Sequence, residues 1–165
     1  MTSVGISSSL RRLVAGFATL AVVLAIVTCA APQARADACD DLAKQLKGQI
    51  DGLTVGKTVA NAIELQHPAL KRASLGCSSR NVTNEVFAAT DARKPAPAFY
   101  DVVAGAAALV FTLPKGDLVT GTTRCIKRIG IFRGYTIATR YRGLDIRCTG
   151  GKTGTTVSIS RQKDV

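Results

Sequence analysis

Residues 144–160, LDIRCTGGKTGTTVSIS, decide the fold of this 165-residue chain. Apolar residues alternate with polar ones on both sides of a glycine turn, at Leu144, Ile146, Cys148, Val157 and Ile159. Because successive side chains of a strand point to opposite faces, the alternation predicts two half-buried strands joined by a turn. Such alternation is typical of an antiparallel sheet that keeps one face in water.

The same pattern of a strand, a cysteine, a polar turn and another strand stands 71 residues earlier in the chain. The corresponding positions are Ala73, Leu75, Cys77, Val86 and Ala88. Direct identities are few, so the pattern has two interpretations, an internal duplication or a chance likeness. A duplicated unit of one helix and three strands predicts a single antiparallel sheet with both helices on one face.

Two segments have helical patterns. Residues 37–50 place Leu42, Leu46 and Ile50 at a spacing of four, as one face of a helix requires. Residues 98–111 are apolar nearly all round and rich in small side chains, which predicts a buried helix packed closely on a sheet. A membrane-inserting helix is the alternative for 98–111, although the segment is too short to span a bilayer.

Further strands are expected from alternation and turn residues, at 60–67, 70–77, 85–89, 118–129 and 135–142. The sequence therefore predicts an α+β fold with two layers. We expect about six mostly antiparallel strands with two helices on one face, and a tandem α-βββ repeat as one form of that arrangement.

The first 36 residues have the three parts of a cleavable signal peptide. Arg11 and Arg12 precede an apolar run over 13–27, and Ala34-Arg35-Ala36 offers a small-x-small cleavage site. The alternatives are an uncleaved anchor over 13–31, a twin-arginine signal and lipidation at Cys29. Cleavage after Ala36 predicts a periplasmic or secreted protein in which 37–165 form a single domain without a transmembrane segment.

Four cysteines remain after residue 36, and an even number in an exported chain predicts two disulfides. The repeat suggests that Cys39 pairs with Cys77 and that Cys125 pairs with Cys148, the second bond joining two strands. The cysteines are widely spaced and His67 is the only histidine of the chain, so we expect neither a metal site nor a cofactor.

The positive charge of the chain is concentrated in its last third. Residues 37–114 hold eight basic and eight acidic side chains, whereas residues 115–165 hold eleven basic and three acidic ones. This asymmetry favours a polyanion or an anionic surface as partner, with solubility as the plain alternative. The predicted contact is a basic C-terminal sheet face formed by Arg124, Arg140, Arg142, Arg147, Lys152 and Arg161.

Arginine forks on such a face match the phosphates and carboxylates of lipid headgroups, lipopolysaccharide or acidic polysaccharide. Nucleic acid is disfavoured as a partner because residues 37–165 contain no Trp, and Tyr135 and Tyr141 are predicted on the apolar side. We therefore expect an exported binding protein of the bacterial envelope or periplasm. A secreted inhibitor or effector that binds another protein is the second hypothesis.

No catalytic constellation is evident in the sequence, so the chain is not expected to be an enzyme. The strings Gly56-Lys57-Thr58 and Gly151-Lys152-Thr153 lack the upstream glycine that a phosphate loop requires. His67 is the remaining candidate for a general base, but the sequence names neither a nucleophile nor an orienting partner for it. A hydrolase that uses His67 is the third hypothesis.

Overall fold

The computed structural model describes residues 33–79, 82–130 and 134–162 of the chain. Residues 37–165 form one compact unit, which holds the described helices and strands apart from residues 33–36 at the start of the first described helix. Most of the predicted signal segment, residues 1–32, lies outside the described residues, as does Cys29.

Along the described chain, one helix is followed by four strands, then by two helices and then by three strands. The elements are α2 (Gln33–Gln49), β1 (Thr54–Val59), β2 (Ala62–Gln66), β3 (Arg72–Gly76), β4 (Val82–Thr90), α3 (Pro97–Phe111), α4 (Lys115–Lys127), β5 (Thr136–Tyr141), β6 (Leu144–Gly151) and β7 (Gly154–Gln162). The predicted α+β class is confirmed. Within the described residues the sheet has seven strands and there are three helices, one of each more than expected.

All seven strands form one antiparallel sheet in the order β1-β2-β3-β4-β7-β6-β5. Two meanders, β2-β3-β4 and β5-β6-β7, meet at the central pair β4·β7, where Val86 lies opposite Ile159 and Ala88 opposite Val157. Counting outward from this central pair, β4, β3 and β2 on one side correspond to β7, β6 and β5 on the other, and β1 is an additional strand at one edge. The pattern that repeats in the sequence therefore falls on equivalent strands of the two meanders.

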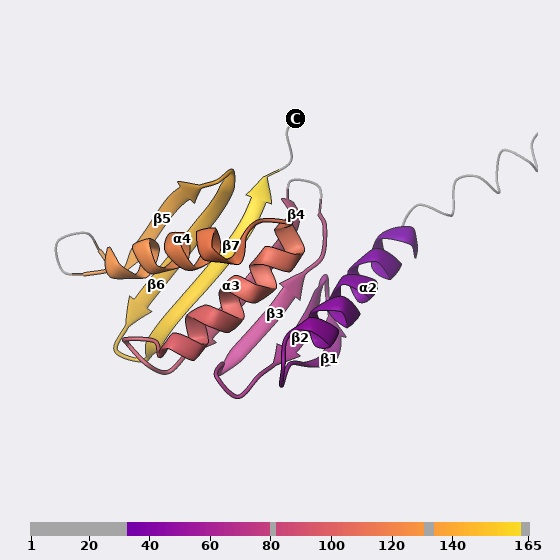
Figure 1. Ribbon diagram of the computed structural model, residues 1–165, viewed down its shortest axis with the longest axis horizontal. Coiled ribbons are helices and arrows are strands. Elements are labelled where there is room, and N and C mark those ends of the chain that lie inside the picture. The colour runs from indigo at the N-terminus through magenta and orange to yellow at the C-terminus, as the bar shows by residue number, and fades with distance from the viewer. Residues whose placement is uncertain (1–32, 80–81, 131–133, 163–165) are drawn as a thin grey trace, which may run out of the picture. The chain divides into compact units, whose positions relative to one another are not determined.

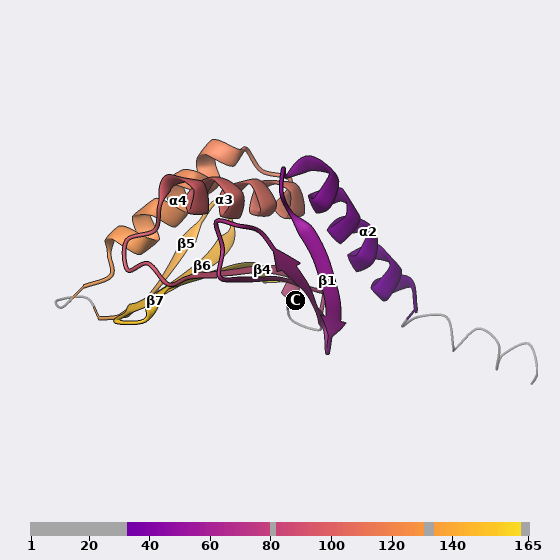
Figure 2. The ribbon, with the colours of Figure 1, turned by 90° about the horizontal axis from the view of Figure 1, so that it is seen from below.

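The helices cover one face of the sheet and leave the other face open (Figures 1 and 2). Helix α3 packs over β4, and α4 packs over β5 and β6. Ala43 and Leu46 of α2 join the same core cluster as the inward residues of the strands. The apolar positions of both repeated patterns point into this core and are buried, except for Cys77, which is half-buried.

One predicted strand, residues 118–129, is wrong, because the structure places helix α4 there. Its buried residues, Leu118, Gly121, Thr122, Cys125 and Ile126, recur at the three- and four-residue spacing of a helix face. The segment contains one valine, three threonines and two isoleucines, and these β-branched residues favour strands when packing does not decide the structure. Here packing favours the helix, because Gly121 lets it lie close to the sheet. An added Cβ at Gly121 would lie 2.8 Å from Ile146 Cδ1.

The second difference is edge strand β1, which lies between the predicted helix over 37–50 and the predicted strand over 60–67. Gly56 fits inside the strand because its missing side chain leaves room for Glu64 of β2.

Both predicted disulfides are present, between Cys39 and Cys77 and between Cys125 and Cys148. The second disulfide joins helix α4 to strand β6 rather than joining two strands, so each bond ties a helix to the sheet.

Candidate functional site

The structure places only two of the six predicted contact residues on the open face of the sheet. In β5 and β6, alternate residues are exposed, and Arg140 and Arg147 belong to the exposed series. They border a shallow depression of about 650 Å³ over β4, β7, β6 and β5. The other four predicted residues lie elsewhere.

Two of the remaining residues stand in hairpin turns at opposite ends of the sheet. Arg142 is in the turn between β5 and β6, and its Nε lies 3.4 Å from Oδ2 of Asp117 in the first turn of α4. Lys152 is in the turn between β6 and β7.

The last two lie on the helix side of the sheet. Arg124 of α4 is stacked over the Tyr141 ring at 5.6 Å, and Arg161 lies over the Phe111 ring at 5.7 Å. The six residues therefore do not form one face.

The open sheet face also carries charges of both signs. Its exposed and half-exposed strand positions include three arginines and three acids, namely Arg72, Arg140, Arg147, Glu64, Glu85 and Asp145. Asp145 Oδ1 lies 4.0 Å from Arg140 Nε, and Glu85 accepts a hydrogen bond from the Ser158 hydroxyl. Nearby charges of opposite sign cancel each other's field, so this face presents little net positive potential to a polyanion.

A second concavity, of about 560 Å³, collects cations without acids. It lies where the C-terminal end of α4 and the first turn of α3 meet the ends of β6 and β7, and we call it the α4-end pocket. Its lining residues are Arg93, Lys94, Pro95, Tyr100, Ile126, Lys127, Ile129, Gly130, Tyr135, Gly150 and Thr155. Among these described residues three are cationic and none is acidic.

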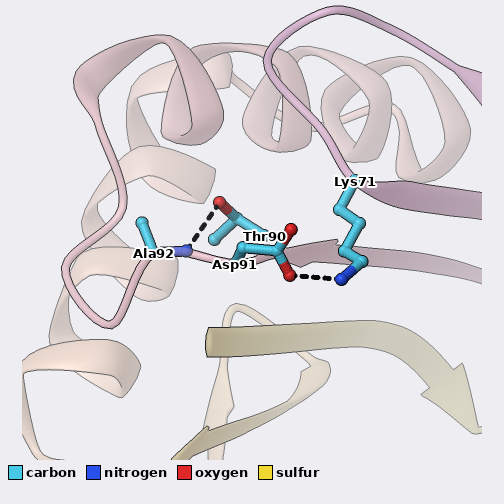
Figure 3. Close-up of polar contacts among 4 residues, drawn as sticks. All are labelled: Lys71, Thr90, Asp91 and Ala92. Atoms are coloured by element: carbon cyan, nitrogen blue, oxygen red, sulfur yellow. Dashed lines mark hydrogen bonds and ion pairs between the residues drawn. The ribbon is translucent and has the colours of Figure 1, made fainter. Parts of the chain in front are cut away.

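The connection between β4 and α3 brings two of these cations to the pocket. Asp91 is held by an ion pair with Lys71, and the Ala92 N–H donates to Thr90 Oγ1 at 3.3 Å (Figure 3). The carboxylate that precedes Arg93 and Lys94 is therefore engaged with Lys71, at the start of β3, and does not line the pocket. On the other side, the buried Thr155 hydroxyl of β7 donates to the Arg93 carbonyl at 3.1 Å and anchors the connection to the sheet.

The interior of the α4-end pocket is largely apolar. Ile126 is buried and Ile129 is half-buried against the core. Gly150 makes room for Ile129, because a Cβ at Gly150 would lie 2.8 Å from Ile129 Cγ2. Burial raises the pKa of the Tyr100 phenol above its ordinary value of 10.0, so this hydroxyl is neutral at pH 7. We refer to Tyr100, Ile126 and Ile129 as the pocket floor and to Arg93, Lys94 and Lys127 as the rim cations.

Sequence reasoning did not identify this pocket. Its lining residues are spread along the chain from Arg93 to Thr155, and only the β4·β7 pairing and the packing of α4 bring them together. Arg93 and Lys94 lie between two predicted elements, the strand over 85–89 and the helix over 98–111. Tyr135, predicted on the apolar side, is 57% exposed at the pocket, whereas Tyr141 does pack against the core.

His67 makes two hydrogen bonds to the backbone. Its Nδ1 accepts the Ala69 N–H at 3.0 Å, and its Nε2 lies 3.0 Å from the Asp51 carbonyl oxygen. Since Nδ1 accepts, the proton of the neutral ring is on Nε2 and is donated to Asp51. The Nε2 bond joins the turn after β2 to the turn after α2, and the Nδ1 bond lies within the turn after β2.

Two other features bear on the alternative hypotheses. The large apolar side chains with high exposure in the described ranges are Val59 of β1 and Tyr135 next to β5, at opposite edges of the sheet. The described part of the chain contains no cluster of three His, Cys, Asp or Glu side chains placed to hold a metal ion.

Among the described helices, none has the length and hydropathy needed to cross a bilayer. Comparison with known proteins gave no match to a family model, a curated protein or a solved structure. The geometry of the α4-end pocket is therefore the basis for proposing a function.

Proposed function

We propose that this chain is an exported, non-enzymatic binding protein, periplasmic or secreted, that holds an anionic partner at the α4-end pocket. One observation carries the proposal: the rim cations line a single concavity whose described lining contains no acid. Export is supported by the signal-like segment 1–36 and by two disulfides, which persist in oxidising compartments.

Electrostatics favours the pocket over the open sheet face. Like charges around a concave, low-dielectric surface reinforce one another and raise the local concentration of an oppositely charged ligand. On the sheet face, Glu64, Glu85 and Asp145 oppose the three arginines. The partner class is that of anionic envelope components, namely lipid headgroups, lipopolysaccharide phosphates or acidic polysaccharides.

Two matched triple variants test this proposal by retention on a heparin column and on vesicles that contain anionic lipid. The first, R93A/K94A/K127A, removes the rim cations. The second, R140A/R142A/R147A, removes three arginines outside the pocket. Each lowers the formal charge of residues 37–165 from +8 to +5, so non-specific attraction falls equally in both.

We expect the first triple variant to elute at markedly lower salt than the second, because attraction at a convergent site is lost only in the first. Equal elution of the two variants would mean that net charge alone governs retention. Loss of retention in the second variant only would assign the contact to the sheet face and its adjoining turn. Either of these results would overturn the assignment to the pocket.

A further inference from the structure

We propose that the α4-end pocket binds a single-chain anionic amphiphile as a monomer, with its charged headgroup at the rim cations and its apolar chain on the pocket floor. This inference rests on the proposed function, since it names the ligand class of the same site. It goes further by separating a small amphiphilic ligand from a polyanion and from a membrane surface.

The first argument is the division of polarity within one concavity. Arg93, Lys94 and Lys127 are all exposed, whereas Ile126 is 9% exposed and Ile129 is half-buried. A small inorganic anion would use only the cations and would leave the apolar floor in contact with water. An amphiphile satisfies both parts, because its chain removes apolar surface from water while its headgroup stays at the charged rim.

The second argument is size. A volume of about 560 Å³ falls within the range of pockets that enclose most of a small organic ligand. The open sheet face, with its depression of about 650 Å³, lacks this division, because serine and threonine hydroxyls and charges of both signs line it.

The third argument concerns what fixes the headgroup. Arg93 offers a planar fork of donors, and Lys94 and Lys127 add compact charges from different elements. The neutral Tyr100 hydroxyl on α3 is one more hydrogen-bond donor in the lining. Carboxylate, sulfate and phosphate headgroups all fit this donor set, so the length of the chain and its charge are the properties to test.

The experiment uses the oxidised protein that begins at Asp37 and measures displacement of the fluorescent probe 8-anilino-1-naphthalenesulfonate. The competitors are hexanoate, octanoate and decanoate, each used below its micelle concentration, together with decanol as an uncharged chain and acetate as a headgroup without a chain. We expect affinity to rise about fourfold for each added methylene until the pocket is filled. Acetate should not displace the probe.

Two pairs of variants separate the headgroup from the chain. R93A/K94A/K127A should weaken decanoate binding by about tenfold or more and leave decanol unchanged, whereas R140A/R142A/R147A should leave both unchanged. Ile129→Ala should weaken decanoate and decanol together. Ile137→Ala is its control, because Ile137 is another half-buried isoleucine that packs against the core but does not line the pocket. Circular dichroism of each variant verifies the fold.

The outcomes separate this inference from the proposed function. If the rim triple variant loses heparin retention but the wild type shows no dependence on chain length, the amphiphile inference fails and the anion site stands. If the rim triple variant alters neither heparin retention nor decanoate binding, both fail. Binding to anionic vesicles without binding to monomeric decanoate would identify a membrane surface as partner and overturn the inference.

Discussion

Removal of either disulfide is expected to cost this domain a large part of its stability. The bond between Cys39 and Cys77 closes a loop of 38 residues, and the bond between Cys125 and Cys148 closes one of 23. In the chain-entropy treatment, loops of these lengths stabilise the folded state by about 3.9 and about 3.4 kcal/mol at 25 °C. Because a domain of this size is stable by about 5–15 kcal/mol, loss of both bonds would leave it marginal or unfolded.

The shorter loop is closed by the more deeply buried disulfide, so burial offsets the difference that loop length makes to the stability lost. Cys125 and Cys148 are both fully buried, whereas Cys39 is 4% exposed and Cys77 is half-buried. Replacing Cys125 and Cys148 by alanine also leaves a small cavity between α4 and β6, which lowers the free energy of unfolding by about 1 kcal/mol more. We therefore expect C39A/C77A and C125A/C148A to be destabilised by similar amounts, each by about 4 kcal/mol.

Guanidinium unfolding followed by circular dichroism measures these costs, with reduced wild-type protein as the reference for complete loss. The m-value should rise in both double variants, because an unfolded chain without the cross-link exposes more surface. A loss below about 1 kcal/mol with an unchanged m-value would refute the reasoning. It would mean that the cross-link does not restrict the unfolded chain.

Three further predictions follow from local geometry. Gly154→Ala should destabilise the domain by about 2–4 kcal/mol in urea unfolding, because Gly154 has a φ of +129° and a Cβ there would lie 2.0 Å from the Thr90 carbonyl oxygen; a loss below 1 kcal/mol would contradict this. Tyr100→Phe should remove part of the tyrosinate absorbance rise above pH 10. Since the pKa of Tyr100 is raised in the folded state, its contribution to stability is complete below pH 10 and is lost as the pH rises through the folded-state pKa, and unchanged alkaline unfolding in the variant would argue against this. His67→Ala should cost about 1–2 kcal/mol through two lost backbone hydrogen bonds, and full stability of the variant would show that these bonds contribute nothing.

The sequence was most informative where one face of a strand is buried. Leu144, Ile146 and Cys148 alternate because β6 has α4 on one side and water on the other, and this contrast appears directly in the residue pattern. The disulfide pairing followed from the same pattern, since each repeated strand ends near a cysteine. The sequence predicted a strand in place of helix α4 because its three threonines, Val119 and Ile126 are β-branched residues with strand propensity, although its buried positions have helical spacing.

The candidate site was much harder to predict than the fold. Arg93 and Thr155 are 62 residues apart, and they meet only because β4 pairs with β7. Two of the three rim cations, Arg93 and Lys94, lie outside residues 115–165, which hold the charge excess, so the charge count did not indicate where the cations of the pocket converge. Arg124 and Arg161 are basic residues of the last third, like Lys127. They are stacked on aromatic rings outside the pocket, and the sequence does not distinguish them from Lys127.

Two pockets at the ends of helices differ in the acids that line them. The pocket at the end of α2, of about 480 Å³, is lined by Asp51 and Asp101, and Lys115 Nζ lies 2.6 Å from Asp101 Oδ1. Its acids offset its single described lysine, so an anion gains little there. The α4-end pocket is similar in size and lacks such acids among its described lining. If the chain selects an anionic amphiphile, Arg93 and Lys94 of the β4–α3 connection and Lys127 at the end of α4 determine which of the two pockets binds it.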